Sequence, residues 1–373
     1  MNWELRPLDE VIEYFIDYRG KTPSKTTHGI PLITAKIVKD GRLLDANEFI
    51  ALEDYENWMT RGYPEIDDIV LTTEAPLGEV ALIKDKNVAL AQRIITLRGY
   101  KDRLDNRFLK YWFQSEYGQY ELDARASGTT VFGIKASVLK KILVPVPCLA
   151  EQKVIASVLL SLDDKINLLL RQNKTLEEMA ETLFRQWFIE EVKEDWKLGT
   201  LEHLIDLKYG KALKQENRSG SGYPVVASSG VVGFHNEYLV EGPGIVIGRK
   251  GTLGKVYFME DSFYPIDTSY FIKTKIPESN LLFEYYLLKS SDFANMNSDS
   301  AVPGLNRNLA LGTAVQIPPL ERIAEFNKLA KPWFSKIYTN TKQIQTLEKI
   351  RDTLLPKLMS GEVRVEYKKV DAE

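Results

Sequence analysis

A heptad pattern of apolar residues in the middle of the chain limits what it can fold into. From Ile155 to Trp187 the pattern advances in alternating steps of four and three, the spacing of a coiled-coil seam. This stretch has no proline or glycine, and as a helix it would be roughly 50 Å long. Such a helix cannot bury its stripe alone, so it needs a long partner helix. The seam positions are Ile155, Leu159, Leu162, Ile166, Leu169, Asn173, Leu176, Ala180, Leu183 and Trp187.

An internal repeat supplies that partner. Residues 344–359 align with residues 173–188, so that Thr175 recurs 171 positions later, and the same offset brings Gly133 onto Gly304. A repeat of this kind is read before any local pattern, because it determines the architecture. A large segment followed by a long helix, occurring twice, predicts two similar globular heads joined by two long helices.

The second long helix is expected to be less regular than the first. Pro332 should start, kink or break it, and Pro356 with Gly361 should mark its C-terminal end. Each seam also holds one asparagine, Asn173 and Asn340. These two residues are either a solvated notch or a polar pair that sets the register of the helices.

The segment before each long helix predicts a head of short strands and helices. In the first head, strands are expected at 30–34, 69–72, 80–83 and 93–97, and an amphipathic helix at 106–120. The second head repeats this order, with Phe283–Lys289 in place of the helix that contains Phe108. The fold class is therefore α+β, with mixed or antiparallel strands and helices in two similar domains. We expect boundaries at 1–147, 148–195, 196–319 and 320–373.

The two heads share a framework and differ in their loops. Residues 244–256 follow residues 68–80 at a constant offset of 176, and Tyr209-Gly-Lys211 is matched with Arg19-Gly-Lys21. Within that frame, Arg249-Lys-Gly-Thr252 replaces Thr73-Glu-Ala-Pro76, so one head is basic where the other is not. Two copies with divergent loops suggest that two related ligands are read at once.

Charge and composition narrow the class of protein. The net charge is −3, but ten acidic and six basic residues lie between positions 151 and 195, so basic patches on the heads are not excluded. One cysteine and three histidines offer neither a disulfide framework nor zinc-ligand spacing. No run of 18 apolar residues and no signal-peptide pattern is present, so we expect a cytoplasmic protein without a membrane partner.

The motifs of an enzyme are missing from the sequence. Gly254-Lys255 is followed by Val256 and not by Ser or Thr, and Arg249 stands where a P-loop needs glycine. No amino-methyltransferase motif and no glycine-rich fingerprint for S-adenosylmethionine is found. The acidic pairs Asp67-Asp68 and Asp163-Asp164 are typical of solvated turn and helix charges. We therefore assign no catalytic residue, no metal site and no cofactor.

Both long helices resemble the repeated segments of a known family. Leu347-Glu-Lys-Ile-Arg-Asp-Thr-Leu-Leu-Pro-Lys-Leu-Met-Ser-Gly-Glu362 resembles the distal conserved segment of specificity subunits of type I restriction–modification systems. Residues 146–152, 162–166 and 175–188 resemble the central conserved segment, and the heads resemble the family through Ser127-Gly-Thr-Thr130 and Gly251-Thr-Leu-Gly254. One departure is Pro319-Leu-Glu-Arg322, which lacks the Glu-Gln pair of the first copy.

The resemblance implies a function for each part. Two target recognition domains would each read one half of a bipartite, asymmetric double-stranded DNA site. The two helices, as an antiparallel coiled coil with pseudo-twofold symmetry, would set the spacing and bind two methyltransferase subunits. Restriction and translocase subunits would join this core. S-adenosylmethionine and ATP would then be bound by the partner subunits.

Loop donors are the candidate DNA contacts. Arginine suits guanine and asparagine suits adenine, whereas Ser, Thr and Lys more often hold phosphates. The candidates are Lys21, Thr22, Ser127, Thr129 and Thr130 in the first head, and Lys211, Arg249, Lys250, Thr252, Ser269, Asn306 and Arg307 in the second. Each of them is otherwise a solvated loop side chain or a turn former. For methyltransferase binding, the candidates are Glu177, Glu178 and Glu181, which lie off the seam and are expected to be free to meet partners.

Two other kinds of protein remain as alternatives. A self-contained methyltransferase or nuclease conflicts with the missing motifs. The other alternative is a coiled-coil adaptor with two protein-binding heads, and the basic loop at Arg249-Lys250 argues against it. Because phosphate contacts make DNA affinity fall steeply with salt, a salt-dependent DNA-binding assay separates the adaptor from the DNA reader.

Overall fold

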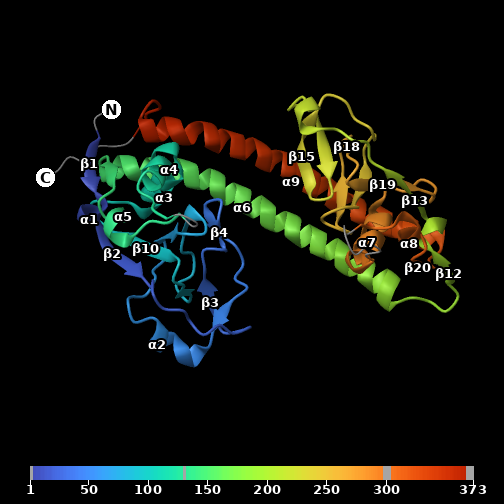
Figure 1. Cartoon of the computed structure of the whole chain (residues 1–373), viewed down its shortest axis with the longest axis horizontal. Helices are drawn as coiled ribbons and strands as arrows, with labels where there is room; N and C mark the ends of the chain where they lie inside the picture. Colours follow the sequence, from blue (N-terminus) through green and yellow to red (C-terminus); the bar gives the residue numbers. More distant parts are fainter. Residues whose placement is uncertain (1–2, 129–131, 297–303, 367–373) are drawn as a thin grey trace. The chain divides into compact units, whose positions relative to one another are not determined.

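The protein is described by a computed structural model that covers residues 3–128, 132–296 and 304–366. The chain forms two compact units, Met1–Asn167 with Gln345–Glu373, and Leu168–Ile344. Each unit contains one head and one half of each of two long helices (Figure 1). We call the part of the first unit before its helices the first head, and the corresponding part of the second unit the second head. The four-part division predicted above stays a prediction.

The first head is built on a four-stranded antiparallel sheet. Its strand order is β2 (Ile12–Asp17), β10 (Ile94–Gly99), β7 (Ile69–Thr73) and β8 (Leu77–Leu82). Around it lie the pair β1 (Glu4–Pro7) and β11 (Leu143–Val146), the hairpin β4 (Val38–Lys39) and β5 (Arg42–Leu43), and the small sheet β6 (Phe49–Ile50), β3 (Ile30–Ile33) and β9 (Ala89–Leu90). Short helices complete it at α1 (Leu8–Val11), α2 (Tyr55–Trp58), α3 (Asn106–Gln114), α4 (Glu116–Asp123) and α5 (Ala136–Leu139).

The second head repeats the main sheet, the terminal strand pair and the small sheet of the first, and its described residues have no counterpart of the β4–β5 hairpin. Its main sheet has the order β13 (Ile205–Tyr209), β19 (Ser269–Thr274), β16 (Gly244–Gly248) and β17 (Val256–Met259). The pair β12 (Lys197–Thr200) and β20 (Ala314–Ile317) corresponds to β1 and β11, and the sheet β15 (Gly230–His235), β14 (Tyr223–Ala227) and β18 (Tyr264–Pro265) corresponds to the small sheet of the first head. Both small sheets contain one parallel pairing, β3 with β9 and β14 with β18. The helices are α7 (Leu282–Ser290) and α8 (Arg307–Leu311). The prediction of two similar α+β heads is confirmed.

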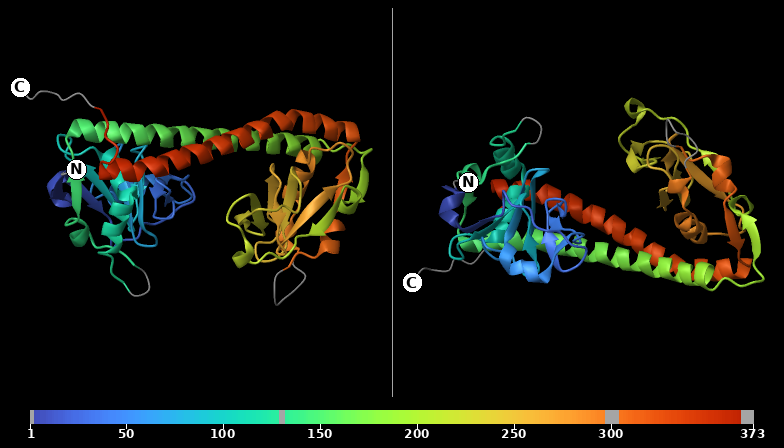
Figure 2. Two further views of the ribbon diagram at one scale, coloured as in Figure 1. Left: turned by 90° about the horizontal axis from the view of Figure 1, so that it is seen from above. Right: turned by 60° about the horizontal axis from the view of Figure 1, so that its bottom comes forward.

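Two long helices, α6 (Leu149–Arg185) and α9 (Leu320–Ser360), pack against each other in antiparallel orientation (Figures 1 and 2). Asp163 contacts Arg351 in the first unit, and Asn173 contacts Asn340 in the second, so the residue numbers rise along one helix as they fall along the other. The seam is buried at Leu159 and Ala180. The Asn340 amide lies fully buried and donates to Asn173 Oδ1 at 2.8 Å, so these residues form a polar pair and not a solvated notch.

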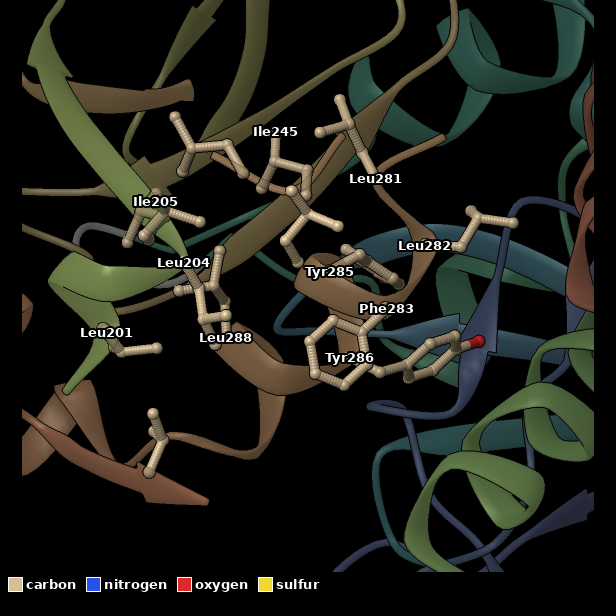
Figure 3. Close-up of a cluster of buried hydrophobic side chains, with 14 of the residues drawn as sticks. Leu201, Leu204, Ile205, Ile245, Leu281, Leu282, Phe283, Tyr285, Tyr286 and Leu288 are labelled. Atoms are coloured by element: carbon tan, nitrogen blue, oxygen red, sulfur yellow. The ribbon is translucent and has the colours of Figure 1, made fainter. Parts of the chain in front are cut away.

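The core of the second unit shows how a head packs on the helices. One face of α7 contributes Phe283 and Tyr286, and the sheet strands contribute Ile205 and Ile245 (Figure 3). Phe326 of α9 joins the same cluster. The first head uses the equivalent helix α3, whose Phe108 lies in one cluster with α6 and α9 residues. Each head therefore shares one hydrophobic core with its own halves of the long helices.

Two expectations from the sequence are wrong in detail, and a third is narrowed. The helix predicted at 106–120 is two helices, because Ser115 is extended and its hydroxyl caps the second one at Gly118. Of the three possibilities for Pro332, the start and the break are excluded, because α9 continues through it and ends before Gly361, where φ is +72°; the kink stays a prediction. Pro356 also lies inside the helix.

The match of Tyr209 with Arg19 is shifted by two residues. Tyr209 pairs with Tyr270 in the second sheet, and the equivalent position in the first sheet, opposite Ile95, is Asp17. The glycine shared by the two short motifs misled the alignment. Among the described helices, none combines the length and apolar character needed to cross a membrane.

Candidate nucleic-acid interface

A basic cavity of about 740 Å³ lies at one end of the main sheet in the second head. It is bordered by the end of β13, the turn after β16, the start of β19 and the segment that leads into α8. Four cationic side chains contribute to its lining. The lining residues are Leu207, Lys208, Tyr209, Arg249, Lys250, Tyr270, Gly304, Leu305, Asn306, Arg307 and Asn308.

Arg249 is held in a defined orientation inside this cavity. Its guanidinium carbon lies 4.9 Å from the ring centroid of Tyr209 and 5.7 Å from that of Tyr270, and its Nη1 donates to the carbonyl of Asp267 at 3.0 Å. Cation–π contacts of this kind are attractive and fix the plane of the guanidinium. Tyr270 is buried, and burial raises the pKa of its phenol. The remaining donors of Arg249 are thus presented from a rigid support.

Arg307, in contrast, is used by the fold. Its Nε donates to the carbonyl of Leu207 at 2.7 Å and its Nη2 to the Asp206 carboxylate at 2.5 Å. The same carboxylate pairs with Lys208, and the hydrogen bond from Lys208 is the main reason that the pKa of Asp206 is lowered. One carboxylate therefore pairs with two of the four cations and neutralises one unit of their charge. The other two cations, Arg249 and Lys250, form no ion pair with the residues that the structure describes.

Asn306 and Ser269 also have structural roles. The side-chain oxygen of Asn306 caps α8 by accepting from the backbone amides of Asn308 and Leu309. Ser269 is fully buried, and its hydroxyl donates to the carbonyl of Ile266 at 2.8 Å. Ser269 is thus inaccessible to a DNA ligand, and we leave it out of the proposed interface.

The other candidates lie in exposed loops. Lys21 and Thr22 follow β2, Lys211 follows β13, and Thr252 lies in the turn after β16. Ser127 is exposed at the start of its loop and pairs with Gly133 through two backbone hydrogen bonds. Thr129 and Thr130 lie outside the described residues.

The base of this loop is built in the same way in both heads. An isolated bridge joins Glu74 to Gly133 in the first head and Lys250 to Gly304 in the second. A second hydrogen bond repeats beside it, from the amide of Ile134 to the carbonyl of Thr73 at 3.0 Å, and from Leu305 to Arg249 at 2.9 Å. The residues related by the offset of 176 (Glu74 and Lys250) are thus bridged to the residues related by the offset of 171 (Gly133 and Gly304).

Sequence reasoning missed three residues of this region. Lys208 and Tyr209 line the basic cavity, and Glu74 occupies the position of Lys250 in the first head. The replacement of Thr73–Pro76 by Arg249–Thr252 carried the signal for Glu74. For Lys208 the signal was weak, because a lysine near a strand end is usually only a solvated residue.

The acidic candidates on α6 differ from one another. Glu177 accepts hydrogen bonds from the phenol of Tyr285 and, with Glu181, from the ammonium of Lys289 at 3.3 and 2.9 Å. The expectation that these carboxylates are free to meet partners is therefore wrong for Glu177 and Glu181, because α7 of the second head faces them. Glu178 is exposed. No cluster of three or more His, Cys, Asp or Glu suited to a metal ion occurs in the described ranges.

Comparisons with known proteins agree on one family. The model of the type I restriction modification DNA specificity domain matches residues 1–178 and 193–349. The chain is 28% identical to the type I restriction enzyme MjaIX specificity subunit of Methanocaldococcus jannaschii over 343 residues, covering 80% of this chain and 78% of that one. It is 26% identical to the EcoprrI specificity subunit of Escherichia coli, covering 81% of each. In fold it is similar to the type I restriction–modification S subunit from M. genitalium, with a TM-score of 0.65, 22% identity and coverage of 99% and 97%.

Proposed function

This chain belongs to the family of type I restriction–modification DNA specificity subunits, and we propose that each of its heads reads one half of a bipartite DNA site. A specificity subunit is the non-catalytic part of its system, and its partners are DNA and the methyltransferase and restriction subunits. Our proposal adds which surface of each head contacts DNA and what sets the distance between the two half-sites.

The observation that carries the proposal is the repeated loop base with different side chains around it. The backbone bonds at Gly133 and Gly304 are alike, whereas the neighbouring side chains are Glu74 in one head and Arg249 with Lys250 in the other. A frame that is kept while its side chains change suits two modules that read two different base sequences. Arginine is also well suited to contact a guanine edge, and the rings of Tyr209 and Tyr270 attract the guanidinium of Arg249.

The long helices have two roles in this proposal. They set the number of base pairs between the half-sites, and their outer faces bind two methyltransferase subunits, one for each copy of the repeat. Restriction and translocase subunits then join this assembly. S-adenosylmethionine and ATP would be bound by these partners, and we place the complex in the cytoplasm, as the lone cysteine suggests.

The contacts that we propose for phosphates and bases are the accessible loop donors. In the first head these are Lys21, Thr22 and Ser127, and in the second head Lys211, Lys250 and Thr252, with Arg249 as a base reader. Arg307 and Asn306 support the cavity wall, since their polar atoms already hold the fold. The adaptor with protein-binding heads is the alternative that the following experiment excludes.

Replacing Arg249 by glutamine should relax the preference for one base in one half-site. The full methyltransferase complex would first be used to define the methylated motif, and the variant would then be measured on duplexes that carry each base at each position. A bidentate arginine–guanine contact contributes about 1–3 kcal/mol, so discrimination at that position should fall at least about fivefold.

Lys197→Gln serves as the matched control. Lys197 is an exposed cation on β12 of the same head, outside the cavity lining, and its loss should leave the motif unchanged. A wild-type complex whose DNA binding is weak and insensitive to both sequence and salt would instead support the adaptor.

A further inference from the structure

The position just after the third strand of each head carries opposite charges. β7 and β16 are equivalent at the offset of 176, so Glu74 and Lys250 occupy the same place, one residue beyond the end of β7 and two residues beyond the end of β16. Each is bridged to a glycine at the base of the loop, Gly133 or Gly304. The bridge to the glycine is therefore shared by the two heads, whereas the side chain at this position has opposite charge.

A close backbone approach holds Glu74 at the loop base. A Cβ added to Gly133 would lie 2.9 Å from the carbonyl oxygen of Thr73 and 3.1 Å from the Cβ of Glu74. No larger residue fits there without a shift of the strand end or of the loop. The position of the Glu74 backbone is consequently well defined, although its side chain reaches the surface.

The Glu74 carboxylate forms an ion pair that the fold does not need. Its Oε1 lies 3.2 Å from Nε of Arg93, and the two side chains are 41% and 56% exposed. Exposed pairs of this type contribute little to stability. The second head has neither member of the pair, because Lys250 and Thr268 stand at these positions and the corresponding backbone bond to Arg249 is kept. A role in ligand recognition explains the pair better than a role in folding.

The chemistry of a carboxylate restricts what it can contact on DNA. Phosphates repel it, and it can only accept hydrogen bonds, so its partners in the major groove are the amino groups of cytosine N4 and adenine N6. Lysine at the same place can only donate, and it suits the O6 and N7 acceptors of guanine.

We propose that Glu74 reads an amino-bearing base in one half-site, while Lys250, at the equivalent place, reads guanine in the other. This inference rests on the proposed function of the heads, and it adds the base class that each head selects at one position. Glu74 was not among the DNA contacts expected from the sequence.

The test compares Glu74→Lys and Glu74→Gln in the assembled complex. After the wild-type motif has been defined, methylation is measured on a duplex library in which each half-site is randomised in turn. We expect Glu74→Lys to lower the preference for cytosine or adenine at a single position of one half-site by at least about fivefold, the size of a base contact of ~1 kcal/mol. Glu74→Gln keeps one acceptor and the side-chain shape, so it should lose part of this preference.

A matched control and a reciprocal variant complete the experiment. Glu13→Lys makes the same change of charge at an exposed residue of β2, near the opposite end of the sheet from Arg93, and should leave both half-sites unchanged. Lys250→Glu should weaken the preference for guanine in the other half-site only.

The outcomes separate this inference from the proposed function. A wild-type complex that shows no bipartite motif would contradict the proposed function. A normal bipartite motif that both Glu74 variants leave intact, or that they weaken equally at every position, would overturn the inference alone. If Glu74→Lys does not fold, the isosteric Glu74→Gln decides in the same way.

Discussion

Asp163 shows how one buried charge is satisfied at the junction of a head with the long helices. Its Oδ2 accepts from Nζ of Lys110 at 2.7 Å and from the phenol of Tyr111 at 2.7 Å, and Arg351 Nη1 lies 3.2 Å from Oδ1. Burial opposes the ionised carboxylate, but these donors outweigh it and lower the pKa of Asp163. Burial also lowers the pKa of Lys110, to about 8, despite the nearby carboxylate. The expectation that Asp163 is a solvated helix charge is wrong, because its side chain is only 13% exposed and pairs with Lys110.

In the second head, mostly apolar side chains occupy the equivalent junction with the long helices. The 171-residue offset places Phe334 where Asp163 stands and Ala180 where Arg351 stands, and aligning Phe108 with Phe283 places Tyr285 at Lys110. The rings of Tyr285 and Phe334 pack with their centroids 5.8 Å apart, and Ala180 is fully buried. The repeat therefore keeps the geometry of the junction and replaces its chemistry.

Replacing Lys110 by methionine should make stability depend differently on alkaline pH. The folded protein releases this proton near pH 8, and the unfolded chain near 10.5. Between these values the unfolded state binds more protons, so the wild type gains stability with rising pH, by up to about 3 kcal/mol, and the methionine variant lacks this gain. Urea unfolding of both proteins between pH 7 and pH 10 measures this gain, as the difference between their free energies of unfolding at each pH. A difference that stays constant above pH 8 would show that Lys110 is not titrating there.

At the level of elements, the contact between α6 and α7 changes what the acidic surface of α6 is expected to do. Lys289 lies between Glu177 and Glu181, so charge reversal at these two residues would disturb the second head itself. Glu178, one position further along the helix, is exposed and is the suitable site for testing partner binding.

We expect Glu178→Lys to weaken co-elution with methyltransferase subunits while the melting temperature of the free chain stays the same. Lys289→Met should do the opposite. It should lower the free energy of unfolding by no more than about 1 kcal/mol, because the ion pair is partly exposed, and the melting temperature should fall accordingly. Assembly with methyltransferase subunits should stay intact. Size-exclusion chromatography and thermal unfolding of the two variants measure both effects. Equal co-elution of Glu178→Lys and the wild type would remove Glu178 from the proposed docking surface.

At the level of the whole molecule, the two helices are proposed to determine the spacer of the DNA site. A heptad adds about 10 Å of helix, which corresponds to about three base pairs. Inserting seven residues into α6 after Asn167 and seven into α9 after Ile344, where the two units meet, keeps the seam paired. The spacer between the half-sites should then lengthen by about three base pairs, and the half-sites themselves should stay the same.

Inserting the heptad into α6 alone is the control. It leaves seven unpaired seam residues and should destabilise the protein without producing a new motif. Methylome sequencing of cells that carry the complete system gives the methylated motif for the wild type, the doubly extended variant and the singly extended variant. If the doubly extended variant is active and keeps the original spacer, the helices do not set the distance.

The amino-acid sequence alone predicts the repeat, the α+β heads and the two long helices, because apolar periodicity and a fixed offset between repeats are properties of the sequence. Packing decided the rest. Ser115 splits a helix that periodicity predicts as continuous, and α9 continues through Pro332, with the neighbouring Ala330 and Trp333 packed in the core of the second unit. Asp163 and Ser269 look like surface residues in the sequence and are enclosed by elements distant along the chain. Local patterns record which faces are apolar, whereas the burial of a single polar side chain depends on segments that come together only in the folded protein.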